Sequence, residues 1–141
     1  MWPESPCGMM IRQIHLALSR NIDNALRKHN LTLSQLSALM LLTEAPNNEL
    51  SLKKLEQLLQ VSQPNVAGLV LRLEKKKMLE GFTDPNDKRI KRVRINQFGI
   101  QCCNEAKYNM ANFERQMLQN MSEEEVIVFK ELLEKVCNNL I

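Results

Sequence analysis

Basic and amide side chains gather in the middle of the chain, and their chemistry suits binding to phosphates and base edges. From Arg72 to Arg94, nine lysines and arginines stand against four acidic residues, so this stretch carries +5 and the remainder −2. A local excess of this kind is the electrostatic signature of phosphate contact. Just before it, Gln63 and Asn65 carry the amides that pair bidentately with adenine.

A helix beginning near Ser62 and ending near residue 76 is predicted to present these groups on one face. Ser62 is expected to cap it, and Pro64 falls in the first turn, where its missing amide costs nothing. The first-turn amides can bind a phosphate, and Gly68 lets the helix approach DNA closely. The predicted DNA-binding residues of this helix are Ser62, Gln63, Pro64, Asn65, Gly68, Arg72 and Lys75.

A basic β-hairpin, or wing, is predicted over residues 80–95, directly after this helix. Residues 79–83 and 90–95 alternate as strands, and Asp84-Pro85-Asn86-Asp87 supplies turn chemistry between them. A flat guanidinium at Arg89 suits a narrow, negative minor groove, and Asp87 can hydrogen-bond and orient it. Lys88, Lys91 and Arg92 are expected to add affinity with little sequence content.

The elements that position these groups are mostly helices. Apolar residues at steps of three and four predict six helices, one of them from Met9 to about His29. The predicted order is four helices, the wing and two more helices, with helix starts at Thr32, Ser51, Ser62, Asn96 and Ser122. The predicted fold is therefore mainly α with a small β-hairpin wing.

The first and the last two helices carry apolar stripes without a compact core of their own. A second copy of the chain is the simplest partner for them. We therefore expect one domain over residues 1–141. Its winged helix-turn-helix head spans residues 32–96, and a helical dimerisation region spans 1–31 plus 97–141.

Composition narrows the classes of function. The 141 residues are 44% apolar and 25% charged, without a bilayer-spanning run or a signal peptide, so we expect a cytoplasmic protein. The sequence has no nucleophile elbow, P-loop or HExxH motif, so neither an enzyme nor a cofactor is expected. His15 and His29 lie about 21 Å apart on one helix, too far to share a metal ion.

The wing carries a resemblance to a known family. Residues 87–99 are similar to the wing signature of MarR-type regulators, which joins D-x-R, an apolar strand, a capping residue and a Gly three positions later. Residues 84–87, 31–35 and 69–74 fit as well, and the element order matches over residues 9–140. The chain departs from the pattern in three places: Asn96 replaces Thr, Lys77 replaces Gly and Gly81 replaces Arg.

The resemblance implies a homodimer that binds a pseudo-palindromic operator as a ligand-responsive repressor. It places the fourth helix in the major groove and the wing tip in the minor groove, with Asp87, Lys88, Arg89 and Lys91 at the DNA. It also implies an effector pocket where the first, second and fifth helices meet the head. Ile14, Leu18, Met40 and Met110 are candidates for its lining, although core packing explains each of them too.

Two alternatives stay open. The first is a redox sensor, because some MarR-type regulators sense peroxide through a cysteine near the start of the first helix that tyrosines hydrogen-bond. Cys7 lies close to that place, but the only tyrosine, Tyr108, is far along the chain. The second is a protein-interaction module, in which the wing does not bind DNA. The other cysteines, Cys102, Cys103 and Cys137, are expected to be small buried hydrophobes. The residues name neither the operator nor an effector.

Overall fold

The computed structural model describes residues 6–141; the first five residues of the predicted dimerisation region lie outside this range. Its elements follow the predicted order, with one added strand, and confirm a mainly helical fold with a small antiparallel sheet. They are α1 (Pro6–Arg27), α2 (Leu33–Glu44), the 3-10 turn η1 (Pro46–Asn48), β1 (Glu49–Ser51), α3 (Leu52–Leu59), α4 (Gln63–Lys75), β2 (Leu79–Thr83), β3 (Lys91–Ile95), α5 (Gln97–Met117) and α6 (Glu123–Leu140).

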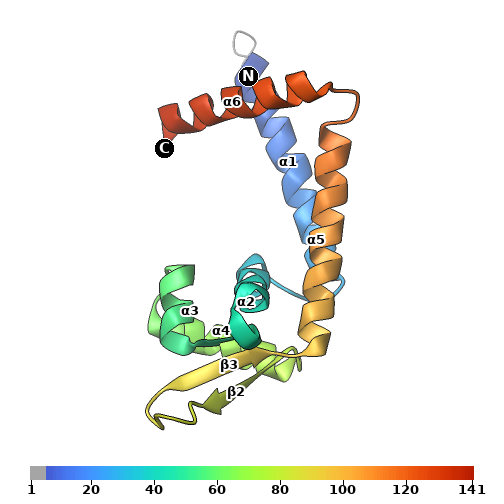
Figure 1. The fold of residues 1–141 in the computed structure, drawn as a ribbon. Coiled ribbons are helices and arrows are strands. Elements are labelled where there is room, and N and C mark those ends of the chain that lie inside the picture. Colours follow the sequence, from blue (N-terminus) through green and yellow to red (C-terminus); the bar gives the residue numbers. More distant parts are fainter. Residues whose placement is uncertain (1–5) are drawn as a thin grey trace.

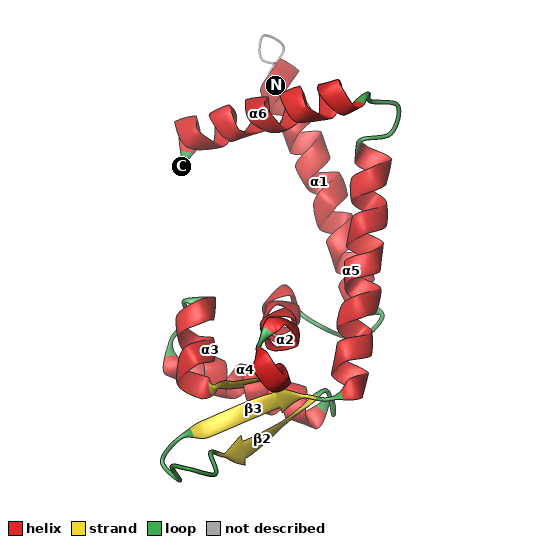
Figure 2. Ribbon diagram, in the orientation of Figure 1, coloured by secondary structure: helices red, strands yellow, loops and turns green. Residues whose placement is uncertain are grey.

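The chain forms a head and the long helices α1, α5 and α6 (Figure 1). The head holds α2, α3, α4 and the sheet, while α5 leads away from it with α1 alongside (Figure 2). At the far end of α5, the chain turns into α6, which lies away from the head (Figure 1). None of the helices described over residues 6–141 combines the length and the apolar character needed to cross a membrane.

The sheet has three strands in the order β1-β3-β2, not the two predicted. β1 was missed because three residues are too few to show a strand period, and its partner lies more than 40 residues away. It pairs antiparallel with β3, with Glu49 opposite Arg94 and Ser51 opposite Arg92. β3 begins at Lys91, so Ile90 belongs to the loop rather than to the strand.

Most predicted helix caps are confirmed. Thr32 and Ser122 each begin a capping box, Ser51 Oγ accepts from Lys54 N at 3.1 Å, and Asn96 Oδ1 accepts from Gly99 N at 2.9 Å. Ser62 does occupy the cap position of α4, but its side chain accepts no hydrogen bond there. The predicted cap at this helix is therefore correct in position and wrong in its side-chain bond.

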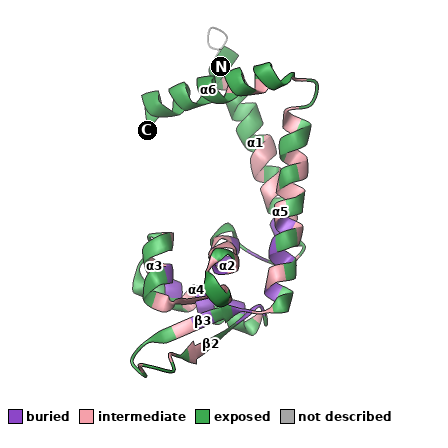
Figure 3. Cartoon of the chain, viewed as in Figure 1, coloured by how far each residue is buried: buried purple, intermediate pink, exposed green. Residues whose placement is uncertain are grey.

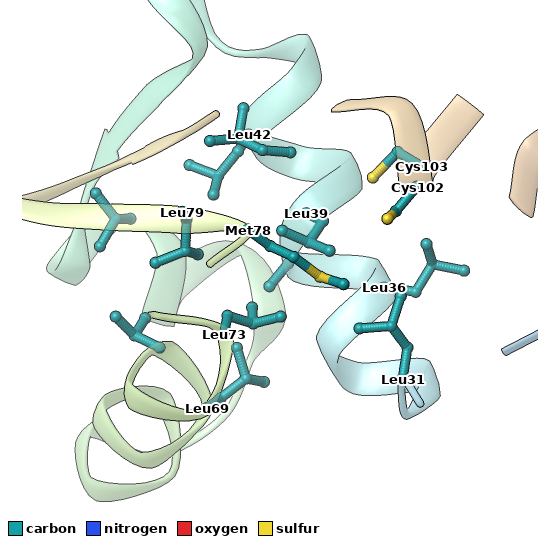
Figure 4. Close-up of a cluster of buried hydrophobic side chains, with 14 of the residues drawn as sticks. Leu31, Leu36, Leu39, Leu42, Leu69, Leu73, Met78, Leu79, Cys102 and Cys103 are labelled. Atoms are coloured by element: carbon teal, nitrogen blue, oxygen red, sulfur yellow. The ribbon is translucent and has the colours of Figure 1, made fainter. Parts of the chain in front are cut away.

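The buried core lies in the head and the adjoining part of α5 (Figure 3). Figure 4 shows leucines of α2 and α4 packed with Met78, Leu79 and the two cysteines of α5. The predicted buried face of α4 is confirmed, since all four of its members are buried: Val66, Leu69, Val70 and Leu73.

A tight junction joins α4, the wing and α5. Asn96 donates its backbone N–H to Met78 O at 3.1 Å and its side-chain amide to Lys77 O at 2.7 Å. Lys77 has the left-handed φ of 59°, the conformation for which helix ends favour glycine. A Cβ on Gly99 would lie 2.3 Å from Met78 O and 2.7 Å from Ile95 Cγ1, so α5 approaches the wing only through a glycine.

The inward face of α5 differs from the predicted stripe at its start. Phe98 is 47% exposed, whereas Gly99, Cys102, Cys103 and Ala106 are buried. The periodicity favoured large apolar side chains, but the close approach at Gly99 requires small ones. The helix also ends at Met117, so Met121, predicted to lie on it, belongs to the following loop.

Polar contacts tie the end of α1 to α5. His29 Nε2 lies 2.8 Å from Glu105 Oε2, and Lys28 Nζ lies 3.4 Å from the same oxygen. Hydrogen bonds from His29 and then Lys28 hold the pKa of the Glu105 carboxyl below its ordinary value. The Glu105 carboxylate is therefore charged at neutral pH, and the contact is lost as acid protonates it.

The outer helices expose apolar side chains that the monomer does not cover. No residue of α6 is buried, and the predicted burial of Cys137 is wrong because this helix has no core to enter. On α1, the predicted stripe is exposed at Ile11 and Ile14. The exposed apolar residues of α6 are Ile127, Val128, Leu132, Leu133, Val136 and Leu140.

The four cysteines divide into two classes. Cys102 and Cys103 are buried, as predicted, while Cys7 and Cys137 are exposed. Burial raises the pKa of the Cys103 thiol to about 11 and also raises that of Cys102. Since the thiolate is the reactive form, the two buried thiols are inert in the folded protein.

Alanine at two helical glycines is expected to change stability in opposite directions. Gly99→Ala should lower the unfolding free energy by about 1–3 kcal/mol, because the added methyl overlaps Met78 O. Gly68→Ala should raise it by about 1 kcal/mol, because no atom lies within 4 Å of the new Cβ in mid-helix. Urea unfolding at one protein concentration measures both, and shifts of the same sign would contradict this packing.

A thiol reagent is expected to separate the two cysteine classes. At pH 8, Cys102 and Cys103 should react only as fast as the head opens, whereas Cys7 should react at once. All four thiols should react in urea, and Cys7→Ser is the control that removes one fast thiol. Rapid reaction of three or more thiols in the native protein would contradict the burial of the α5 pair.

Candidate nucleic-acid interface

A groove of about 850 Å³ runs between α3, the start of α4 and the wing. It brings together Gln63, Arg89 and Lys91, three of the predicted DNA-binding residues that lie up to 28 positions apart in sequence. Ser51, Leu52, Lys53, Glu56, Gln57, Val66, Ala67, Ile90 and Arg92 complete its lining. A helix start beside a basic hairpin gives this groove both amide and cationic donors.

The first turn of α4 presents its polar groups to solvent. Ser62, Gln63, Pro64 and Asn65 are all exposed, and the buried side of the helix begins only at Val66. The Ser62 hydroxyl makes no cap bond, which leaves it available to a phosphate together with the first-turn amides. Farther along, Gly68 is half-buried, and Arg72 and Lys75 are exposed in the last turn.

The wing tip holds an oriented guanidinium. Asp87 accepts from Arg89 three times, at Oδ1 from the backbone N at 3.0 Å and from Nε at 3.2 Å, and at Oδ2 from Nη2 at 3.2 Å. These hydrogen bonds, the side-chain ones first, hold the pKa of the Asp87 carboxyl below its ordinary value. The Arg89 side chain is nevertheless 91% exposed. Asp87 therefore orients the guanidinium, while most of its surface remains accessible to a ligand.

Lys88 and Lys91 flank this tip and are exposed. The Asp84-Pro85-Asn86-Asp87 turn that precedes them is closed by Asn86 N donating to Asp84 Oδ1 at 2.8 Å. Asp84 N also donates to Ile90 O at 2.9 Å across the loop. The loop is therefore held by its own carboxylates, and its basic side chains point outward.

Several basic residues of the +5 stretch are engaged inside the protein. Lys76 donates to Gln35 Oε1 at 2.9 Å, which ties the end of α4 to the start of α2. The Arg92 guanidinium contacts Glu49 at 3.4 Å and Asp84 at 3.8 Å, and is only 25% exposed. Arg92 therefore has ionic partners within the protein, and the expectation that it supplies phosphate affinity stays a prediction.

Sequence reasoning missed the contribution of α3 to the groove. Lys53 and Gln57 line it from positions four apart on one helix face, while Leu55 is fully buried on the other. That spacing was the available signal. It was overlooked because α3 was considered only for its apolar face.

Over residues 6–141, the four candidate effector residues divide between exposed positions and positions packed on the core. Ile14 is 42% exposed, Leu18 is half-buried, and Met40 and Met110 pack against the core. A hollow of about 320 Å³ between α1 and α5 is lined instead by five side-chain amides, with Ala25 and Phe113: those of Asn21, Asn24, Asn109, Asn112 and Gln116.

The structure also places the residues that were considered for redox sensing and for metal binding. Cys7 is exposed in the first turn of α1, and Tyr108 is 65% exposed on α5. His29 is engaged with Glu105, whereas His15 is exposed on α1. Over residues 6–141, no three His, Cys, Asp or Glu side chains are grouped to hold a metal ion.

Comparison with known proteins gives a consistent family and fold. Residues 31–91, which include the helix-turn-helix and most of the wing, match the MarR family model. No curated protein matches the chain. Among solved structures, the S. aureus MepR–DNA complex is 25% identical, with 95% of this chain and 99% of that chain covered and a TM-score of 0.81.

Two further structures share the fold from end to end. YusO from Bacillus subtilis is 17% identical, covers 95% of this chain and 94% of its own, and has a TM-score of 0.82. Apo MarR from E. coli is 23% identical, with 93% and 96% covered and a TM-score of 0.71. The winged head is therefore similar to the MarR family over residues 31–91, and the whole chain shares the fold of MarR-type regulators.

Proposed function

We propose that this protein is a transcriptional repressor that binds a pseudo-palindromic operator in double-stranded DNA as a cytoplasmic homodimer. The groove between α4 and the wing carries this proposal, because it joins exposed amides of a helix start to an oriented arginine. The MepR complex with DNA, a protein of the same fold, supports DNA as the partner. Neither catalysis nor a cofactor enters the proposal.

Each part of the groove has a role in this complex. The start of α4 enters the major groove, where Gln63 and Asn65 contact base edges and the Ser62 end binds a phosphate. Arg89 enters the adjacent minor groove, while Lys88 and Lys91 contact the backbone. Lys53 of α3 lies on the same groove and adds a further phosphate contact.

The homodimer rests on the exposed apolar faces of the outer helices. Six apolar side chains of α6 and four of α1 are more than a third exposed, far beyond scattered surface residues. A second copy covers them without any new partner. Two heads held in this way read half-sites about 34 Å apart.

An effector acts in this scheme by preferring a different separation of the two heads. The amide-lined hollow between α1 and α5 lies on the helices that connect the dimer region to the head. Carboxamides beside the Phe113 ring suit a neutral, polar, partly aromatic molecule. Release of DNA by such a molecule is the ligand response that we propose.

Selection from a random pool of duplexes tests the proposed function. The full chain should enrich fragments that share two inverted half-sites with centres about one helical turn apart. Binding to them should weaken steeply between 50 and 200 mM salt, roughly 10³-fold or more if six phosphates are contacted. Failure to enrich any sequence, together with no binding to duplexes at low salt, would refute the proposal.

Arg89→Ala is expected to cost about 1–3 kcal/mol of operator binding, because it removes the wing-tip guanidinium. Arg89→Lys keeps the charge and loses the planar fork, so it should recover only part of the affinity. A gel shift at fixed salt measures both, with Arg12→Ala on α1 as a distant control of equal charge. Equal affinities of Arg89→Ala and the parent would show that the wing tip does not contact DNA.

Leu133→Glu is expected to convert the dimer toward monomer, because it places a carboxylate in the exposed apolar stripe of α6. Light scattering across a concentration series measures the change in mass. Asn138→Glu adds the same charge to an exposed polar position of the same helix and should leave the dimer intact. A parent chain that is monomeric at every concentration would contradict the assembly.

A further inference from the structure

The sheet carries an ion network on the face that turns away from the core. Along β3, Val93 and Ile95 are buried, so alternation places Arg92 and Arg94 on the opposite face. Glu80 and Phe82 of β2 pair with these arginines in register and share that face. Glu49 of β1, opposite Arg94, completes the network from the other side of β3.

Glu49 binds both arginines at once. Its Oε2 accepts from Arg94 Nε at 2.9 Å and from Arg94 Nη2 at 2.6 Å, and its Oε1 lies 3.4 Å from Arg92 Nε. The Glu49 side chain is only 16% exposed, so the carboxylate is largely shielded from water. Charge-assisted contacts of this geometry are stronger than neutral ones and fix the orientation of the arginine fork.

The other contacts of the network are looser. Arg94 Nη1 lies 4.0 Å from Glu80 Oε1, and Glu80 is 68% exposed. The Arg94 guanidinium also lies over the Phe82 ring, 4.6 Å from its centre. Glu49 is therefore the main ionic partner of Arg94, and Glu80 is a weak one that carries the same charge on the same face.

Glu49 connects β1 to the second strand of the wing. β1 has three residues and directly precedes α3, so Glu49 is anchored beside a helix of the head, whereas both arginines lie on β3, the second strand of the wing. Arg92 lies three residues from Arg89, and it also contacts Asp84 at the start of the loop. A force holding Arg92 and Arg94 to β1 thus fixes the direction in which the tip projects.

We propose that Glu49 is a positioning residue, which clamps the wing onto the head so that Arg89 is held ready for DNA. This inference rests on the proposed DNA binding. For removal of the Glu49 carboxylate, the clamp and simple electrostatics predict opposite changes in DNA affinity. Removing a carboxylate near DNA and freeing two arginines should strengthen phosphate binding. Loosening the clamp should weaken binding, because the mobile wing must be ordered again at the complex.

Glu49→Gln and Glu80→Gln form a matched pair, since each removes one carboxylate from the same side of the sheet. Glu49→Gln should weaken operator binding about three- to ten-fold at fixed salt. Glu80→Gln should leave the affinity unchanged or slightly higher. Glu49→Asp keeps the charge but shortens the reach, so it should weaken binding as well. Equal or tighter binding by Glu49→Gln would overturn the clamp.

A measurement without DNA separates this inference from the proposed function. Amide hydrogen exchange over residues 84–91 should be faster in Glu49→Gln than in Glu80→Gln, while the amides of α2 and α5 keep the parent's protection. Unchanged exchange in the wing overturns the clamp, even if the parent binds DNA. If the parent protein does not bind DNA, only the proposed function is overturned. If Glu49→Gln does not fold, hydrogen exchange is measured on Glu49→Asp instead.

Discussion

The junction around Asn96 is the constraint on which the arrangement of this molecule depends. One residue bonds to the last turn after α4 through Lys77 O, to the wing base through Met78 O, and to the first turn of α5 through Gly99 N. Gly99 permits it, because any side chain there would overlap Met78 O. The end of α4, the base of the wing and the start of α5 are therefore bound together at one point.

The basic residues of β3 differ in their partners. Lys91 is exposed and lines the groove beside α4, whereas Arg92 lines the same groove but contacts Glu49, as Arg94 does. A count of basic residues treats all of them as equal. An arginine paired with a carboxylate, however, has less positive charge to offer to a phosphate than an unpaired lysine. The freely exposed cationic surface of the wing is thus smaller and more localised than the sequence total indicates.

The local features of the fold were predictable from the sequence, and the non-local ones were not. Capping boxes at Thr32 and Ser122, the buried face of α4 and the Asp87–Arg89 contact depend on residues close together in the chain. β1 forms only by pairing across more than 40 residues, and Glu49 acquires its partners in the same way. The candidate DNA-binding residues came from helix and turn patterns, whereas the α3 side of their groove required the packed structure.

The molecule combines a head with a complete core and long helices without one. Buried residues end near Ala106 on α5, and no residue of α6 is buried. The head therefore has a buried core that favours its folding, while the outer helices leave apolar side chains uncovered in the single chain. In the proposed homodimer, α5 is fixed to the head at Asn96 and to α1 through His29 and Glu105, so a change in how two copies pack moves each head together with its α5.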